Sequence, residues 1–243
     1  MWSIFRRELQ SFFYTPLGYT LWGTFLMING LLLWIFPSNF NTLEAGFGDL
    51  NLFFELNPWL LIFLLPAMGM KSFSEELKLG TLELLLTKPL STAQLVIAKF
   101  CALAVLLLVT LSVSVFYVTI IEDVLRIGDA IDWGVFTGSF LGLFSFSLVL
   151  AAISLWASTL VESAFSAFLI AVFVGLFHYY GWGQIAALFN DFTTYNFFKS
   201  IGLQFHYSEL NKGVIRLTNV VYLLLQVGFF LWCTHLNLNQ KSR

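Results

Sequence analysis

Charged residues are scarce in this chain of 243 residues, where Asp, Glu, Lys and Arg together make up 11% of the sequence. An average soluble domain carries about 25%. Hydrophobic residues make up 58% of the chain, and its mean hydropathy is +0.83. So little charge cannot cover the surface of a soluble protein of this length. The composition therefore excludes a soluble globular fold and indicates a protein embedded in lipid.

Cysteine and histidine are also rare. The two cysteines, Cys101 and Cys233, are too few for a disulfide framework, and we expect no disulfide. The three histidines, His178, His206 and His235, do not have the spacing of metal ligands. We expect no metal site.

The sequence lacks the motifs of two catalytic classes, nucleotide hydrolases and intramembrane proteases. The sequence contains no G-x-x-x-x-G-K-[ST] loop, so nothing in it can hold the phosphates of a nucleotide. An intramembrane protease of the E-E-x-x-x-R type would need Arg five positions after Glu75, and Gly80 stands there instead. We therefore expect no catalytic residues, no bound cofactor and no enzymatic activity of the chain itself.

Long apolar runs are what the chain does have. A helix needs about 20 apolar residues to cross a hydrocarbon core about 30 Å thick. The sequence predicts an all-α integral membrane protein with six spans, at 17–36, 52–71, 92–121, 134–160, 163–180 and 217–236. The first run is longer than the roughly 7 to 15 residues of a signal-peptide core and has no A-x-A-like cleavage site after it, so we expect it to remain as a span.

Positive charges fall unevenly on the two sides of the membrane that six spans define. One side carries eight: Arg6, Arg7, Lys71, Lys78, Lys88, Lys99, Lys241 and Arg243. The other carries four: Arg126, Lys199, Lys212 and Arg216. Because short positively charged loops stay in the cytoplasm, we expect the first side, with both termini, to be cytoplasmic.

The segment 1–15 before the first span is amphipathic. Its apolar residues recur at spacings of three and four: Trp2, Phe5, Leu9 and Phe12. Arg6 and Arg7 lie elsewhere on the same helix, and Pro16 ends it. The pattern predicts an interfacial elbow helix with its basic face toward lipid headgroups.

Glycine and proline inside two spans mark places of special packing. Pro66 and Gly69 in the second span indicate either a tolerated kink or a functional hinge. Gly138 and Gly142 form a GxxxG pattern in the fourth span, which permits close helix contact.

The segment 181–216, on the side opposite the termini, is too polar to span and too aromatic for a solvated loop. It is either a pair of short helices that dip into the outer leaflet or a small capping subdomain.

The cytoplasmic segment 72–90 is unusually polar for this chain, and six of the 25 residues from 75 to 99 are charged. Ser91 and Gln94 form a capping box for the third span. The segment is either an interfacial helix lying on the headgroups or a lever that binds a partner protein through its leucines and charges.

The residues from Glu76 to Lys99 read E-x-x-x-G-T-L-E-x-L-L-x-x-P-L-S, followed by a lysine eight residues after the serine. This pattern resembles the cytoplasmic signature of type-two ABC transporter permeases. The order of elements resembles that family too, with an elbow helix, six spans, a tight turn between spans four and five, and an outer re-entrant segment. Gliding-motility permease subunits are the most similar group, with the permeases of nitrous-oxide-reductase maturation close to them.

The resemblance implies a permease subunit of an ATP-driven exporter in the bacterial inner membrane, linked to gliding motility. A separate cytoplasmic ABC ATPase would bind ATP and Mg, and a second permease, identical or homologous, would complete the assembly. The ATPase-coupling residues it implies are Glu75, Glu76, Gly80, Thr81, Leu82 and Glu83, with Glu162 in a second contact. Membrane lipid is expected as a partner and nucleic acid is not. The alternative is a complex that transports no solute and transmits ATP-driven movement to a periplasmic partner.

Overall fold

The computed structural model describes residues 1–37, 41, 50–82, 91–125 and 132–241, and all the regular structure in these residues is helical. Six helical segments are long and apolar enough to cross a membrane: Gly18–Ile35, Asn51–Lys78, Thr92–Tyr117, Trp133–Leu160, Ala164–Ala186 and Leu217–Lys241. The all-α fold with six candidate spans is therefore confirmed.

Helix α1 (Trp2–Tyr14) meets α2 (Pro16–Gly30) at a corner. Thr15 at the corner is extended, with φ −98° and ψ 142°, and Pro16 occupies the first position of α2. Proline suits that position because its missing N–H has no partner in the first turn of a helix. A π-helical turn, η1 (Leu31–Ile35), continues α2 toward the other end of the molecule.

The second span is a nearly continuous rod of two helices. Helix α4 (Asn51–Gly69) contains Pro58 and Pro66, and α5 (Lys71–Lys78) follows it after Met70 alone. Helical structure thus extends to Lys78, seven residues beyond the predicted end of the span. Gly80, with a φ of +65°, then turns the chain in a conformation that favours glycine.

Helix α8 (Trp133–Leu160) lies at the centre of the bundle. It packs against α4, α9 (Ala164–Leu176), α7 (Thr92–Leu125) and α13 (Leu217–Lys241). Small side chains such as Ala151, Ala152 and Ser154 are buried along it and allow this close approach. The predicted capping box at the start of α7 is confirmed, because Ser91 and Gln94 exchange hydrogen bonds of 3.3 and 3.2 Å.

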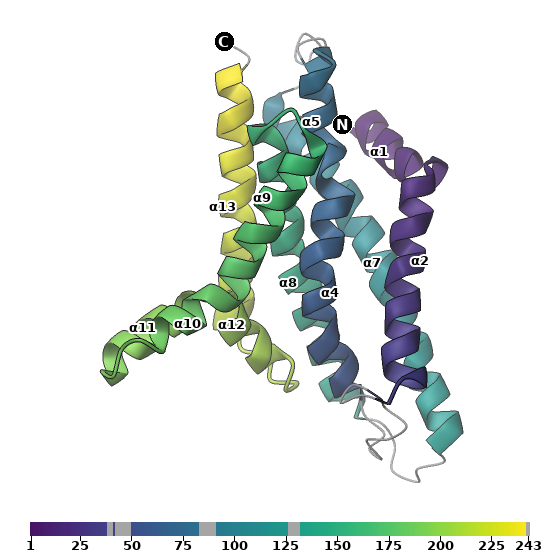
Figure 1. The fold of residues 1–243 in the computed structure, drawn as a ribbon, viewed down its shortest axis with the longest axis vertical. Helices are drawn as coiled ribbons and strands as arrows, with labels where there is room; N and C mark the ends of the chain where they lie inside the picture. Colours follow the sequence, from purple (N-terminus) through teal and green to yellow (C-terminus); the bar gives the residue numbers. More distant parts are fainter. Residues whose placement is uncertain (38–40, 42–49, 83–90, 126–131, 242–243) are drawn as a thin grey trace.

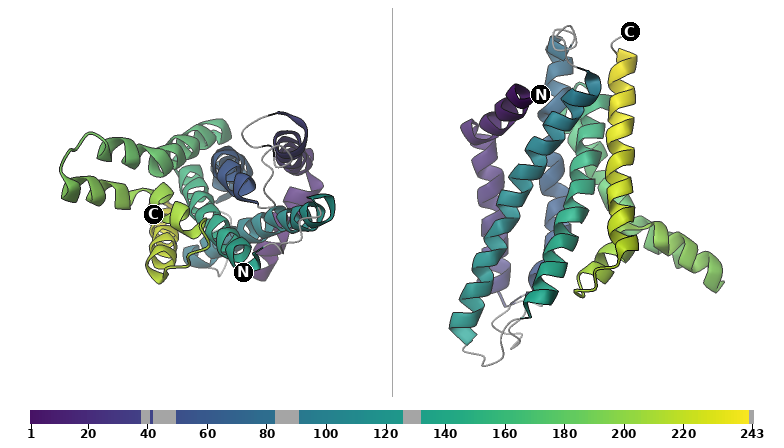
Figure 2. Two further views of the ribbon diagram at one scale, coloured as in Figure 1. Left: turned by 90° about the horizontal axis from the view of Figure 1, so that it is seen from below. Right: turned by 180° about the vertical axis from the view of Figure 1, so that it is seen from behind.

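Three short helices follow α9 and the π-helical turn η2 (Phe177–Gly181). They are α10 (Trp182–Ala186), α11 (Phe192–Ile201) and α12 (Leu203–Leu210). Helices α10 and α11 pack against each other and project sideways from the bundle (Figure 1, Figure 2). Helix α12 instead packs against α8 and α13, where Gly142 of the predicted GxxxG pattern lies against Leu210.

The two ends of the bundle carry different elements. Helix α1, the end of α5, the start of α7 and the end of α13 gather at the top of Figure 1, called here the upper end. The start of α4 and the α10–α12 segment lie toward the lower end. The elements that the charge pattern assigns to one side of the membrane are thus together in space.

Candidate functional site at the upper end of the bundle

Among the described residues of the upper end, Lys99 is the most deeply buried charge, with 2% of its side chain exposed near the start of α7. Its Nζ lies 2.9 Å from Glu76 Oε1 and 3.1 Å from Glu8 Oε1, and it donates a hydrogen bond to the carbonyl oxygen of Ser72. The same ammonium stands 4.7 Å from the centre of the Phe73 ring. Removing an ammonium from water is costly, and these contacts together offset that cost.

Arg7 of α1 completes the group. Its Nη2 lies 2.9 Å from Glu76 Oε1 and 3.1 Å from Glu8 Oε1, and half of its side chain is exposed. Partial burial alone would lower the pKa of Arg7, but hydrogen bonds and charges from Glu8 and Glu76 raise it above its ordinary value. Arg7, Glu8, Glu76 and Lys99 are called the ion cluster below.

The ion cluster joins three elements that are far apart in the sequence. Arg7 and Glu8 come from α1, Glu76 from α5 and Lys99 from α7. The register of α5 explains why Glu76 takes part and its neighbour does not, since consecutive residues point about 100° apart on a helix. Glu75 therefore points away from Lys99 and pairs with Lys71 at 2.9 Å, with about half of each side chain exposed, while only 14% of Glu76 is exposed.

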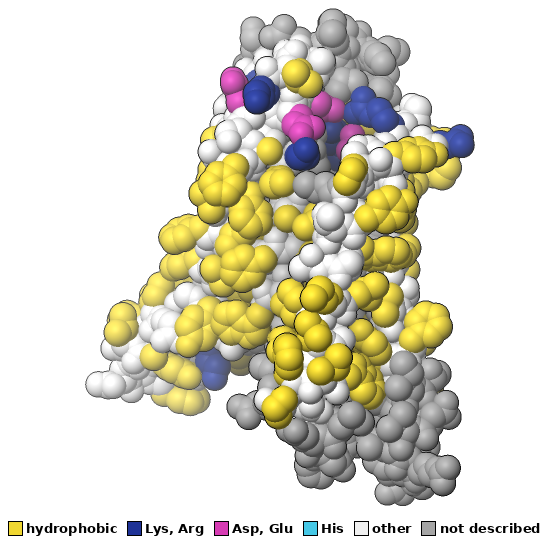
Figure 3. Space-filling view, turned by 45° about the vertical axis from the view of Figure 1, so that its right-hand side comes forward, with side chains coloured by type: hydrophobic (Ala, Val, Ile, Leu, Met, Phe, Trp, Pro, Cys, Tyr) yellow, Lys and Arg dark blue, Asp and Glu magenta, His cyan; other side chains and the backbone are white. Residues whose placement is uncertain are grey.

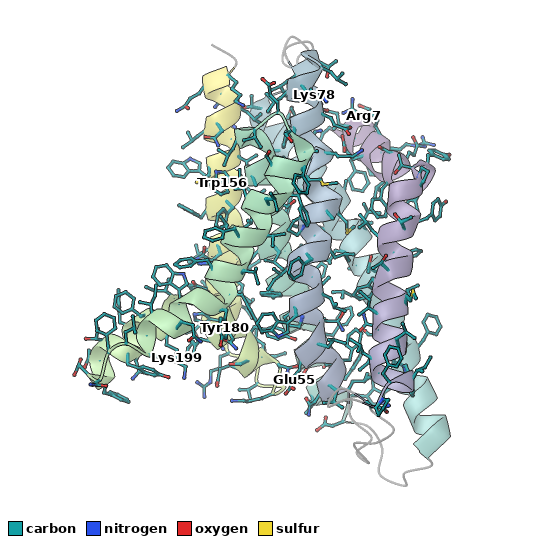
Figure 4. All side chains as sticks on the ribbon, viewed as in Figure 1. Arg7, Glu55, Lys78, Trp156, Tyr180 and Lys199 are labelled. Carbon is teal, nitrogen blue, oxygen red and sulfur yellow. The ribbon has the colours of Figure 1, made fainter. Side chains whose placement is uncertain are left out.

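A cavity of about 310 Å³ lies beside the ion cluster, between α1, α4, α5 and α7. All four cluster residues line it, together with Lys71 and Glu75. Figure 3 shows basic and acidic side chains crowded together at this end, above a surface that is mainly hydrophobic. In Figure 4, Arg7 and Lys78 lie at the same end of the molecule, opposite Glu55, Tyr180 and Lys199.

The coupling residues implied by the family resemblance include both exposed and buried side chains. Glu75 and Gly80 are exposed, and Thr81 is partly exposed with its hydroxyl 3.4 Å from the Glu76 carbonyl oxygen. Glu76 belongs to the ion cluster, and Leu82 is buried with 3% exposed.

The other two coupling residues are Glu83 and Glu162. Glu83 lies outside the described residues. Glu162 is exposed in the turn that joins α8 to α9, at the same end as α5. The coupling role of this set as a whole remains a prediction.

The predicted hinge lies against α8. A Cβ added at Gly69 would stand 2.2 Å from Ser154 Oγ, and the Ser154 hydroxyl is 3.5 Å from the Pro66 carbonyl oxygen. This is a point of very close packing between α4 and α8. The role of Pro66 and Gly69 as a hinge during function remains a prediction.

Arg6 and Arg7 of α1 point in different directions, as Glu75 and Glu76 of α5 do. Arg6 is exposed, in agreement with a residue that faces headgroups or water, whereas Arg7 turns toward Glu76. On the apolar face, Phe5, Leu9 and Phe12 pack against the core, while Trp2 is exposed. Helix α1 is therefore fastened to the bundle by both its apolar side and Arg7.

Sequence reasoning missed Glu8 and the role of Lys99. A signal was present, because Lys99 stands alone inside an apolar run and the signature begins with Glu76 and ends with Lys99. A lone cation in such a run needs an anionic partner. The two ends of the signature are the partners, with Nζ and Oε1 2.9 Å apart.

A second polar network closes the upper end from the side of α13. Thr92 at the start of α7 contacts His235 Nδ1 at 2.9 Å and Asn239 Oδ1 at 2.7 Å. Lys241 donates to the carbonyl oxygen of Thr159 at 2.8 Å, at the end of α8. These contacts fasten the last turns of α13 to two neighbouring spans.

The other two histidines also have protein partners. Trp182 donates to His178 at 3.1 Å, and His206 lies 2.9 Å from Asn219. Among the described residues, no three His, Cys, Asp or Glu side chains come together as a metal site would require.

Comparison with protein families places the chain. A protein-family model described as "ABC-2 family transporter protein" matches residues 24–233. No curated protein matches the chain.

Proposed function

This chain belongs to the ABC-2 transporter family, as a multi-pass membrane permease subunit, and from that premise we propose that it is the membrane half of an ATP-driven exporter. A separate ABC ATPase binds the upper end at the exposed part of the segment between spans two and three. Closure of that ATPase on ATP and Mg moves the spans attached to the segment. The upper end is then cytoplasmic, and the membrane is the bacterial inner membrane.

The observation that carries this proposal is the mechanical connection of α5. It continues α4 almost without interruption, and Glu76 ties it to Lys99 of α7 and to Arg7 of α1. A force applied at the tip of α5 therefore reaches the second and third spans directly, and reaches the first span through α1. A flexible loop in this place could not transmit such a force.

The surface available to an ATPase is the outer face of α5 and the turn after it. Glu75, Lys78 and Gly80 are exposed there, and Leu79 exposes 72% of its surface. An exposed leucine next to charged residues suits a protein interface, in which the leucine enters a groove and the charges set the register. Glu162 is at the same end and is a candidate for a second contact.

The proposal is tested by reversing Glu75 in the purified complex of permease and ATPase. We expect Glu75→Arg to weaken stimulation of ATP hydrolysis by roughly tenfold, because reversing an exposed charge at the contact would disturb the charge complementarity of the two proteins. The matched control is Lys212→Glu, a charge reversal at the exposed lower end. Glu76 is unsuitable as the test residue, since its reversal would break the ion cluster. Copurification without any ATPase, or equal stimulation in the two variants, would contradict the proposal.

The finer assignment follows the resemblance of the chain to gliding-motility permease subunits of the GldF type. We propose that the assembly contains a second permease, identical or homologous, and serves that machinery. Mass analysis of the copurified chains distinguishes a homodimer from a heterodimer of permeases.

The projecting α10–α11 segment favours a second candidate function, in which movement is transmitted to a periplasmic partner without transport of a solute. Leu188 and Phe192 expose 79% and 81% of their surfaces on this segment. Substitution of both by Ser would abolish binding of such a partner and spare ATPase stimulation. If the segment only rests in the outer leaflet and has no partner, the variant and the wild type will show the same binding to periplasmic proteins. That result would contradict the second function.

A further inference from the structure

The cavity beside the ion cluster combines a charged wall and an apolar wall. The charged wall has three cations and three carboxylates: Arg7, Lys71, Lys99, Glu8, Glu75 and Glu76. The apolar wall includes Phe12, Met68, Leu103 and Leu106. The charges balance, so a ligand with a net charge gains little over one that carries both signs. An amphipathic zwitterion matches both walls.

The charged groups beside the cavity have unused hydrogen-bonding capacity of both kinds. Arg7 on α1 and Lys71 on α5 keep 51% and 45% of their side chains exposed, and both are natural ligands for a phosphate. On the acidic side, Glu76 Oε2 is buried and has no hydrogen-bond donor among the described residues, while Glu75 is half exposed. A buried carboxylate oxygen without a donor is costly, so an N–H group that reached it after a small shift of the Glu76 side chain would be stabilising. Glu75 can accept a hydrogen bond from a ligand directly, because half of its side chain is exposed.

We propose that this cavity binds the headgroup of an aminophospholipid, such as phosphatidylethanolamine, from the adjacent leaflet. Arg7 and Lys71 hold the phosphate, and the wall with Glu75 and Glu76 accepts hydrogen bonds from the ammonium. The first carbons of the lipid chains lie against Phe12 and Leu103. A choline headgroup is attracted to the carboxylates but has no N–H to donate, so it makes no hydrogen bond to the acidic wall. The site depends only on the chain lying in a membrane, and not on the proposed transport function.

Such a lipid would join the same elements as the ion cluster. Its phosphate would bridge α1 and α5, and its chains would contact α7, so that it acts as an additional tie at the upper end. The amphipathic character of α1 places this cavity at the headgroup level, where the concentration of phospholipid is high. A soluble ligand would leave the apolar wall uncovered.

Native mass spectrometry of the full chain in detergent, titrated with lipids of identical acyl chains, tests the proposal. We expect phosphatidylethanolamine to bind about tenfold more tightly than phosphatidylcholine. Arg7→Gln and Lys71→Gln should each weaken phosphatidylethanolamine binding about tenfold. The matched controls are Arg6→Gln and Lys78→Gln, which remove a neighbouring exposed cation from the same helix but do not line the cavity.

Thermal unfolding of each variant separates loss of the lipid from loss of the fold, since Lys71 lies outside the ion cluster and its replacement should leave stability nearly unchanged. Equal affinity for the two lipids overturns the proposal, as does unchanged binding to the Lys71→Gln variant. Glycerophosphoethanolamine supplies the headgroup without chains. If it binds as tightly as the lipid, the ligand is a free phosphate compound and the lipid assignment is wrong.

Discussion

At the scale of single residues, Lys99 is the position on which most of the upper end depends. Lys99→Met keeps the length of the side chain but leaves Glu8 and Glu76 with Arg7 alone. We expect a loss of roughly 3 kcal/mol in the free energy of unfolding, because breaking a buried pair leaves an uncompensated charge. Thermal unfolding in detergent measures it, with the exposed Lys78→Met as control.

A double variant tests whether the loss comes from the pair itself. Adding Glu76→Gln to Lys99→Met should recover part of the stability, because one of the unpaired carboxylates is then neutral. If the two losses simply add, the ion cluster does not act as a unit.

Asp191 is a residue whose effect depends on pH. Its carboxylate caps α11 by accepting hydrogen bonds from the backbone N–H and the hydroxyl of Thr194, at 3.0 and 2.9 Å. These bonds lower the pKa of Asp191 below its ordinary value. The carboxylate therefore stabilises the start of α11 above the ordinary pKa of aspartate, about 3.9, and this contribution is lost as the pH falls through the lowered pKa.

Hydrogen exchange of the first amides of α11 measures that contribution. We expect Asp191→Ala to exchange faster than wild type at neutral pH. Asp191→Asn keeps a capping oxygen and should exchange more slowly than the alanine variant, without the dependence on acid. Identical exchange in the three proteins would show that the cap has no part in holding α11.

At the scale of elements, the α12 segment approaches α8 closely at two glycines of α8. A Cβ added at Gly138 would stand 2.9 Å from the Gly213 Cα, and one at Gly142 would stand 2.7 Å from the Leu210 Cβ. Gly213 itself has a φ of +77°, so the chain after α12 can pass close to α8 only with glycine there. The predicted close contact at the GxxxG pattern is thus confirmed, and its partner is the α12 segment.

Gly138→Ala should therefore destabilise the protein by about 1 to 3 kcal/mol, because the neighbouring backbone must move. Gly228→Ala in α13 is the matched control, since no atom lies within 4 Å of the added methyl group. There the change should be neutral or stabilising by up to about 1 kcal/mol, from helix propensity alone. Equal unfolding temperatures for the two variants would show that α12 moves away from α8 at little cost.

At the scale of the whole molecule, the charge bias predicts which end faces the cytoplasm. Cys101 and Cys233 are free thiols and would be replaced by Ala before labelling. In intact cells, the Lys78→Cys variant should then be protected from an impermeant maleimide, and the Lys199→Cys variant should react with it. Permeabilised cells serve as the control, in which both should react. The reverse pattern would show the opposite orientation, in which α5 faces away from the cytoplasm and cannot contact the ATPase.

The sequence by itself determined the helical class, the six spans and the capping box, because length, hydropathy and local spacing act within one element. It did not show that Lys99 pairs with Glu8 and Glu76, nor that Glu75 and Glu76 face different ways. The lone Lys99 indicates that an anionic partner is needed, but which carboxylates meet it depends on how α1, α5 and α7 are rotated about their axes and brought together. The tertiary structure alone decided the ion cluster, the cavity beside it and the sideways course of α10 and α11.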